Sequence, residues 1–178
     1  MPRILDLGCG PGKYPGAIGA DRLRQSAADV LCDFDRGRLP FAENSFDEVR
    51  AVHVIEHAED PVRLVEEMHR VARPGGLLVI VTPHCSDASS YTDPTHRRHL
   101  NSFSFRFFYP GGVHGSDHFY SPVRLRERRL RIRLLRLWRW LGLEFLVNHS
   151  RAFRRFWEYY LCFVVRGKVM EFELEVLK

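Results

Sequence analysis

The stretch ILDLGCGPG, residues 4–12, decides the fold class of this chain. Its first four residues form a short apolar run that carries one acid, Asp6, and a glycine-rich turn follows at once. Glycine lets a backbone turn sharply and approach a ligand closely. The glycines alternate and a proline lies among them, so the spacing differs from the G-x-G-x-x-G of dinucleotide-binding folds. The stretch predicts a strand and a turn that meets a ligand lacking a pyrophosphate.

The residues that follow read as alternating strands and helices. Residues 48–55, EVRAVHVI, predict a strand, and Asp60-Pro61 predicts the start of a helix, with the acid as N-cap and proline at the first position. Residues 74–76, Pro-Gly-Gly, end that helix, and the apolar run 77–82 predicts a buried strand. This order is typical of a parallel α/β sheet.

The second half of the chain has weaker periodicity. Residues 84–122 are rich in His, Ser, Pro and aromatic residues, and a loop of this length is usually functional. Residues 128–137 alternate arginine with apolar residues, which suits a strand, although a helix also fits. Aromatic residues at helical spacing predict a helix over 151–163, and clean alternation predicts a strand over 169–176.

Composition narrows the class of protein. A chain of 178 residues suits one domain, and its thirteen glycines and ten prolines exclude a helical bundle or coiled coil. The longest apolar run, 77–81, is too short to span a membrane, and the first residues lack the apolar core of a signal peptide. We therefore expect a cytoplasmic protein without a membrane partner. Four cysteines without a CxxC pair predict free thiols.

Charge is divided unevenly along the chain. Residues 1–90 carry 10 basic and 14 acidic residues, net −4, whereas 91–178 carry 17 basic and 8 acidic residues, net +9. The net charge of +5 therefore describes the second half of the chain.

Four motifs in this order resemble the class I S-adenosylmethionine-dependent methyltransferases, in particular their small-molecule branch: residues 4–12, LPFAENSFD at 39–47, VIEH at 54–57 and RVARPGG at 70–76. The resemblance implies a Rossmann-like, doubly wound α/β sheet of seven strands, mostly parallel with an antiparallel last strand. It also implies S-adenosylmethionine as cofactor and methyl transfer to an O, N or C nucleophile of a small molecule. We expect one domain over 1–178, with a cofactor-binding half at 1–83, an acceptor loop or lid at 84–122, and C-terminal strands and a helix at 123–178.

The resemblance further implies a cofactor-binding set at the ends of the first four strands: Asp6, Gly8, Cys9 and Gly10 for the methionine part, Asp21 for the ribose hydroxyls, Asp33 and Phe34 for the adenine, and His53 for the pocket floor.

The first crossover departs from the family pattern. Only eight residues separate Gly12 from Asp21, whereas a parallel crossover usually needs a dozen or more. Either the first helix is reduced to a turn, or Asp21 lies in a helix and Asp33 or Asp35 binds the ribose. We prefer Asp21, because the spacing to the 39–47 motif already places Asp33. The chain also begins almost at its first strand, so a lid would come from 84–122 or from a second subunit of a homo-oligomer.

The acceptor side is predicted in the segment after the fifth strand. His96, in DPTHRRH at 93–99, is the candidate base or acceptor-positioning group, and His84 is a second candidate. His57 matches a structural position of the family and is left out of catalysis. Glycines around His114 and His118 disfavour a helix, so no metal site is predicted.

Two other functions remain open at this point. The arginine-rich run 124–139 could serve an RNA-directed methyltransferase, although no nucleic-acid motif accompanies it, so nucleic acid is not the favoured partner. A chain with a shortened crossover could also be a non-catalytic, cofactor-binding subunit of an assembly.

Overall fold

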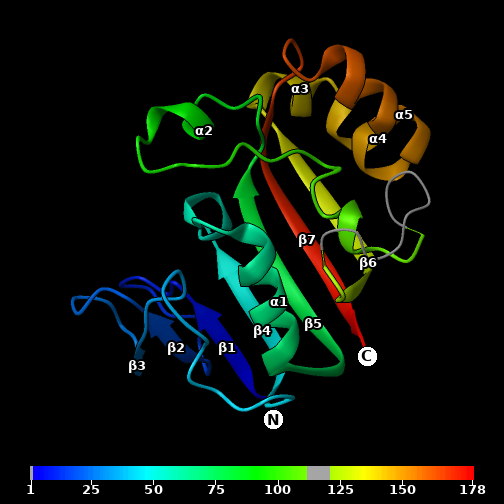
Figure 1. Ribbon diagram of the computed structural model, residues 1–178. Helices are drawn as coiled ribbons and strands as arrows, with labels where there is room; N and C mark the ends of the chain where they lie inside the picture. Colours follow the sequence, from blue (N-terminus) through cyan, green and yellow to red (C-terminus); the bar gives the residue numbers. More distant parts are fainter. Residues whose placement is uncertain (1, 112–120) are drawn as a thin grey trace.

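The computed structural model describes residues 2–111 and 121–178, and these residues form one seven-stranded sheet in the order β3-β2-β1-β4-β5-β7-β6 (Figure 1). The strands are β1 (Ile4–Leu7), β2 (Ile18–Asp21), β3 (Val30–Leu31), β4 (Phe46–Val52), β5 (Ala72–Pro83), β6 (Arg124–Leu134) and β7 (Gly167–Leu177). The helices are α1 (Pro61–Val71), α2 (Ser89–Thr92), α3 (Arg136–Trp140), α4 (Leu143–His149) and α5 (Arg151–Phe156), with the short turns η1 (Ile55–His57), η2 (Arg106–Phe108) and η3 (Trp157–Leu161).

Strand directions divide the sheet into two parts. Strands β1 to β5 are parallel to one another, whereas β7 is antiparallel to both β5 and β6. The carboxyl ends of the five parallel strands therefore meet at one edge of the sheet. The prediction of a seven-stranded, mostly parallel, Rossmann-like sheet with an antiparallel last strand is confirmed.

The first crossover is a turn and not a helix. Residues 8–17, all of which the structure describes, form turns and bends, and Asp21 is the last residue of β2. The crossover is fastened by Asp29, whose carboxylate accepts hydrogen bonds from the N–H of Gly19 (2.8 Å) and from Nζ of Lys13 (2.7 Å). The first of the two alternatives from the sequence, a helix reduced to a turn, is therefore confirmed.

Helix α1 begins and packs as its sequence predicts. Oδ1 of Asp60 accepts a hydrogen bond from the N–H of Arg63 (3.0 Å), and Pro61 occupies the first turn, where a missing N–H costs nothing. Near the other end, Nε2 of His69 donates to the carbonyl of Leu177 (3.0 Å) and so joins the helix to the end of β7.

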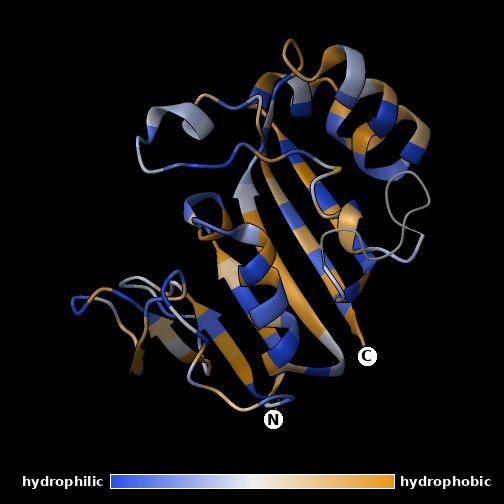
Figure 2. Ribbon diagram, in the orientation of Figure 1, coloured by the Kyte–Doolittle hydropathy of each residue, from blue (hydrophilic) through white to orange (hydrophobic). Residues whose placement is uncertain are grey.

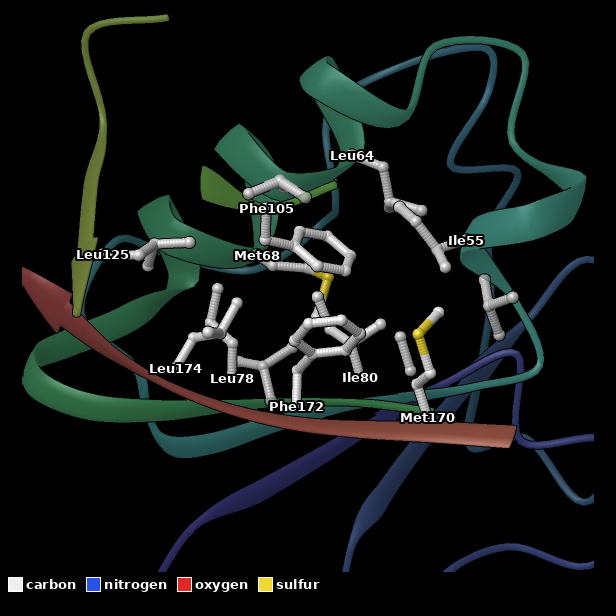
Figure 3. Packing of buried hydrophobic residues seen from close by; sticks show 14 of the residues in the cluster. Ile55, Leu64, Met68, Leu78, Ile80, Phe105, Leu125, Met170, Phe172 and Leu174 are labelled. Carbon is white, nitrogen blue, oxygen red and sulfur yellow. The ribbon is translucent and has the colours of Figure 1, made fainter. Parts of the chain in front are cut away.

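The core lies between α1 and one face of the sheet. Figure 3 shows Leu64 and Met68 of α1 facing Leu78 of β5 and Phe172 of β7, and all four side chains are almost fully buried. Phe105, in the segment before η2, closes the same core with its ring 4.7 Å from that of Phe172. Phe105, 19 positions before the start of β6, thus packs on β7, an interior strand of the sheet.

Strands β6 and β7 form an amphipathic pair. Hydrophobic and hydrophilic residues alternate along both strands (Figure 2). On the polar face, Arg126 and Arg128 form ion pairs with Glu175 at 3.4 and 2.7 Å, and Arg129 pairs with Glu173 at 3.4 Å. The prediction of a strand in this region is confirmed, and its arginines are partly neutralised by the acids of β7.

The segments around these strands contain little regular structure. Residues 84–111 include α2 and η2, and the predicted helix over 151–163 forms as α5 followed by the π-helical turn η3. Trp157 anchors this turn, because its fully buried indole donates to the carbonyl of Val165 (2.7 Å). All four cysteines are free. In the parts of the chain that the structure covers, no helix is long and apolar enough to cross a membrane.

Candidate cofactor and acceptor site

The glycine turn after β1 keeps an open backbone beside two buried acids. Gly8 and Gly10 have φ angles of +61° and +54°, which L side chains rarely adopt. A methyl group on Gly8 would lie 2.4 Å from Cγ2 of Val54, whereas a methyl group on Gly10 would have no atom within 4 Å. Gly8 thus packs against the protein, and Gly10 leaves space for a ligand.

Asp6 and Asp21 hold this turn in place through backbone N–H groups. Oδ2 of Asp6 accepts from the N–H of Tyr14 (2.8 Å), and Oδ2 of Asp21 accepts from the N–H of Gly10 (2.9 Å). The other oxygen of Asp21 accepts from the N–H of Leu23 (2.8 Å). Burial raises the pKa of the Asp6 carboxyl, although the hydrogen bond from Tyr14 opposes this shift. Cys9, between the two glycines, is buried, and its burial likewise raises the pKa of its thiol.

Asp33 and Asp35 follow β3 and have different surroundings. Asp33 is partly exposed, and its Oδ1 accepts from the N–H of Asp35 (3.1 Å). Oδ1 of Asp35 accepts from the N–H of Glu59 (3.0 Å) and so ties the loop to the segment before α1. Phe34, between the two acids, packs against the core. Asp35 therefore has a bracing contact, while Asp33 keeps a partly exposed carboxylate at this edge of the sheet, 3.4 Å from Nε of the exposed Arg36.

His53 follows β4 directly, at the same edge. Its φ of +56° turns the chain out of the strand, and its half-exposed ring places Nδ1 3.0 Å from Oε1 of Glu56. This hydrogen bond raises the pKa of His53. Glu56 itself is 1% exposed.

Figure 1 shows the segment around α2 above the ends of β4 and β5. His96 follows α2 in this segment and contacts His57 in the turn that follows β4. Its ring packs edge-on to that of His57 at 4.6 Å, and its side chain is 8% exposed. The contact depends on the backbone N–H groups of Arg97 and Arg98, which donate to the carbonyl of Glu56 at 2.8 and 3.1 Å.

His84 has a different environment. Its side chain is fully buried at the end of β5, where Nε2 lies 3.0 Å from Oε1 of Glu158 and Nδ1 lies 2.7 Å from Oγ of Ser86. In this arrangement His84 has no surface that an acceptor could touch. His114 and His118 lie outside the described residues.

Two residues of this edge were not assigned a functional role from the sequence. Glu56 and His57 stood out only as part of the VIEH motif, and His57 was interpreted as structural. The structure places both beside His96, which is about 40 positions further along the chain. The sequence feature that could have indicated a functional role is an acid–histidine pair directly after the end of a strand. Ligands bind at this edge in open α/β sheets.

The residues at the strand ends fit S-adenosylmethionine. Gly10 presents an open backbone, and each oxygen of Asp21 has one hydrogen bond to a main-chain N–H, which leaves a lone pair on each for the hydroxyl of a ligand. Asp6 and Asp33 add acids on either side, which suits a ligand that carries a sulfonium and an ammonium group.

Comparisons with known proteins agree with this geometry. A family model for a methyltransferase domain matches residues 15–80. Cycloartenol-C-24-methyltransferase 1 of Oryza sativa subsp. japonica is 29% identical over 119 residues, covering 54% of this chain and 35% of that protein. A probable S-adenosylmethionine-dependent methyltransferase of Mycolicibacterium smegmatis is 32% identical over 119 residues, covering 56% and 46%. The chain therefore matches less than half the length of either relative.

The fold is also similar to a solved structure. An S-adenosylmethionine-dependent methyltransferase from Archaeoglobus fulgidus superposes with a TM-score of 0.64 at 15% sequence identity, over 98% of this chain and 86% of that chain. At this identity the likeness concerns the fold alone. The family match over residues 15–80, the related sequences and the strand order together support a class I S-adenosylmethionine-dependent methyltransferase.

Proposed function

We propose that this chain transfers a methyl group from S-adenosylmethionine to an O, N or C nucleophile of a small-molecule acceptor. One observation carries the proposal: Asp6 in β1, Asp21 at the end of β2 and Asp33 after β3 lie near the carboxyl ends of three adjacent parallel strands, beside a glycine turn whose backbone is open at Gly10. A ligand with hydroxyl and cationic groups can be held there from several sides.

The proposed contacts follow the strand ends in order. The turn residues Gly8, Cys9 and Gly10, with Asp6 behind them, take the methionine part. Asp21, at the end of β2, takes the ribose hydroxyls, since its carboxylate already faces the turn.

The adenine end of the pocket uses the next strands. Asp33 accepts from the adenine amino group with Phe34 beside the ring, and His53 forms the floor after β4. Asp35 is not included, because its carboxylate braces the loop through Glu59.

The acceptor is placed on the side of the 84–111 segment. S-adenosylmethionine supplies a methyl group already activated on sulfur, so the protein has to align the nucleophile and, where required, remove its proton. Nδ1 of His96 lies 3.3 Å from the carbonyl of Ser90, which can only accept, so Nδ1 carries the proton and Nε2 keeps a lone pair. His96 is thus our acceptor-positioning group or base, in preference to the buried His84.

Calorimetry with S-adenosylmethionine and S-adenosylhomocysteine tests the cofactor site. We expect micromolar binding to the unmodified protein and at least about tenfold weaker binding to Asp21→Asn, which corresponds to about 1.4 kcal/mol or more. Asp60→Asn is the matched control, because it removes the same negative charge and asparagine also caps a helix. Titrations are made well below the thermal transition of each variant.

The outcomes separate the alternatives. Unchanged affinity in Asp21→Asn would move the ribose contact to Asp33. Failure of the unmodified protein to bind either ligand would refute the proposal and favour a non-catalytic subunit. With an acceptor in hand, His96→Ala should lower turnover without changing cofactor affinity.

A further inference from the structure

Three side chains with metal-binding atoms converge beside the end of β4. Glu56, His57 and His96 each offer one ligand atom, and these atoms lie within 4.8 Å of one another. Two parts of the chain meet to form the cluster, since the backbone N–H groups of Arg97 and Arg98 donate to the carbonyl of Glu56. The position is therefore fixed by main-chain hydrogen bonds and not by mobile side chains alone.

The hydrogen bonds of His57 determine where its proton sits. Oγ1 of Thr95 donates its only proton to Oδ1 of Asp93 (2.6 Å), so it can only accept from Nδ1 of His57, 2.9 Å away. The carbonyl of Thr95, 3.3 Å from the same nitrogen, is also an acceptor. Nδ1 of His57 thus carries the proton, and Nε2 of the neutral ring has a free lone pair.

His96 has the same tautomer for a similar reason. Its Nδ1 lies 3.3 Å from the carbonyl of Ser90, which cannot donate, and its Nε2 lies 3.8 Å from Oδ2 of Asp93, beyond hydrogen-bond distance, so Nε2 of the neutral ring also has a lone pair. Both histidines of the cluster are therefore oriented by partners outside it, as metal-ligating histidines usually are.

Glu56 supplies the third electron-pair donor. Its side chain is buried, Oε1 accepts from His53, and Oε2 has no hydrogen-bond partner among the described residues. A buried carboxylate oxygen without a donor is costly, because it has lost its contacts with water. The cluster thus presents two imidazole lone pairs and one unpaired carboxylate oxygen, and none of these atoms carries a proton. A bound cation would satisfy all three.

We propose that Glu56, His57 and His96 bind a divalent transition-metal ion, for which Zn²⁺ is the best match. Two imidazoles and one carboxylate suit Zn²⁺, which binds imidazole nitrogen at about 2.0–2.1 Å and is usually tetrahedral. Ligand atoms around such an ion lie about 3.3 Å apart, so the present arrangement needs side-chain adjustments of about 1 Å. The chain Asp93–Thr95–His57 provides the outer hydrogen bonds that fix such a site.

Three protein ligands leave one tetrahedral position for water or for an acceptor atom. If the proposed methyl transfer holds, an acceptor oxygen or nitrogen at this position would be oriented and made more acidic by the ion. His96 then serves as a metal ligand, and the positioning role assigned to it above is exercised through the ion.

Titration of the chelator-stripped protein with ZnCl₂, without S-adenosylmethionine, tests the inference. We expect one Zn²⁺ per chain by calorimetry, and Co²⁺ should give the visible absorption of a tetrahedral site. His96→Ala and Glu56→Gln should each weaken Zn²⁺ binding by about 100-fold or more, while Thr95→Ala, which removes only an outer hydrogen bond, should weaken it by about 10–100-fold. His149→Ala is the control, because His149 is exposed and its Nδ1 bonds to its own helix at the carbonyl of Phe145.

The results decide between the site and its alternatives. Absence of binding at 100 µM Zn²⁺ (about 5.5 kcal/mol) would overturn the inference, and so would equal affinity in the unmodified protein and His96→Ala. Circular dichroism checks that each variant is folded, and if Glu56→Gln is not, Thr95→Ala and His96→Ala still decide. Cofactor binding without metal binding would refute this inference and leave the proposed function intact. Metal binding without cofactor binding would refute the proposed function and leave this inference intact.

Discussion

Gly8 and Gly10 offer a matched pair of substitutions that separates backbone strain from steric conflict. Both have a positive φ, so alanine at either position should cost about 1–2 kcal/mol for the left-handed conformation. Only at Gly8 does the new methyl group meet the protein, 2.4 Å from Cγ2 of Val54, a buried side chain. Overpacking of this kind adds about 1–3 kcal/mol. Gly8→Ala should therefore lower the free energy of unfolding by about 2–5 kcal/mol, and Gly10→Ala by about 1–2 kcal/mol.

Urea unfolding without cofactor measures both variants, with the denaturant slope as a check that the two-state description holds. Because the conflict at Gly8 is with one side chain, Val54→Ala should relieve it, and a double-mutant cycle between the two positions should return a favourable coupling of about 1–3 kcal/mol. Equal losses in Gly8→Ala and Gly10→Ala, or a coupling near zero, would show that Val54 does not limit the space at Gly8.

Two further predictions concern the core and pH. Burial lowers the pKa of His69, so below about pH 6.5 the unfolded chain binds a proton that the folded chain resists, and the unfolding free energy should fall as pH falls. In His69→Gln this component is absent, so the destabilisation caused by that substitution should shrink between pH 7.5 and 5.5, and a constant or growing difference would contradict the reasoning. Trp157→Phe leaves the carbonyl of Val165 without its donor and opens a void, so it should lower the free energy of unfolding by about 2–4 kcal/mol in the same urea assay. A loss below about 1 kcal/mol would mean that water replaces the indole.

Local sequence was sufficient to predict the elements that local interactions define. The Asp60-Pro61 start of α1, the alternation in β7 and the glycine turn after β1 each depend on neighbours within a few residues. The run that became β6 was open to strand or helix because both periods fitted. The strand forms because this run pairs with β7. Arg126 lies opposite Glu175, which is 49 positions further along the chain.

The site was predictable for the strand ends and not for the contacts between distant segments. Asp21 was preferred because the spacing to the 39–47 motif already placed Asp33, and it is the last residue of β2. The burial of His84 depends on Glu158, 74 positions away, and the cluster around His96 depends on the carbonyl of Glu56, 41 positions before Arg97. No local pattern carries the information that these segments touch.

The position of β7 inside the sheet has a consequence for the order in which the chain folds. β6 is made before β7, yet β7 is its only hydrogen-bonded neighbour among the described strands. During synthesis, the apolar face of β6, with Leu125, Ile132 and Leu134, therefore waits unpaired while β1 to β5 can already assemble. An unpaired strand with such a face is prone to associate with other chains, so nascent-chain solubility should depend on how quickly residues 167–177 leave the ribosome.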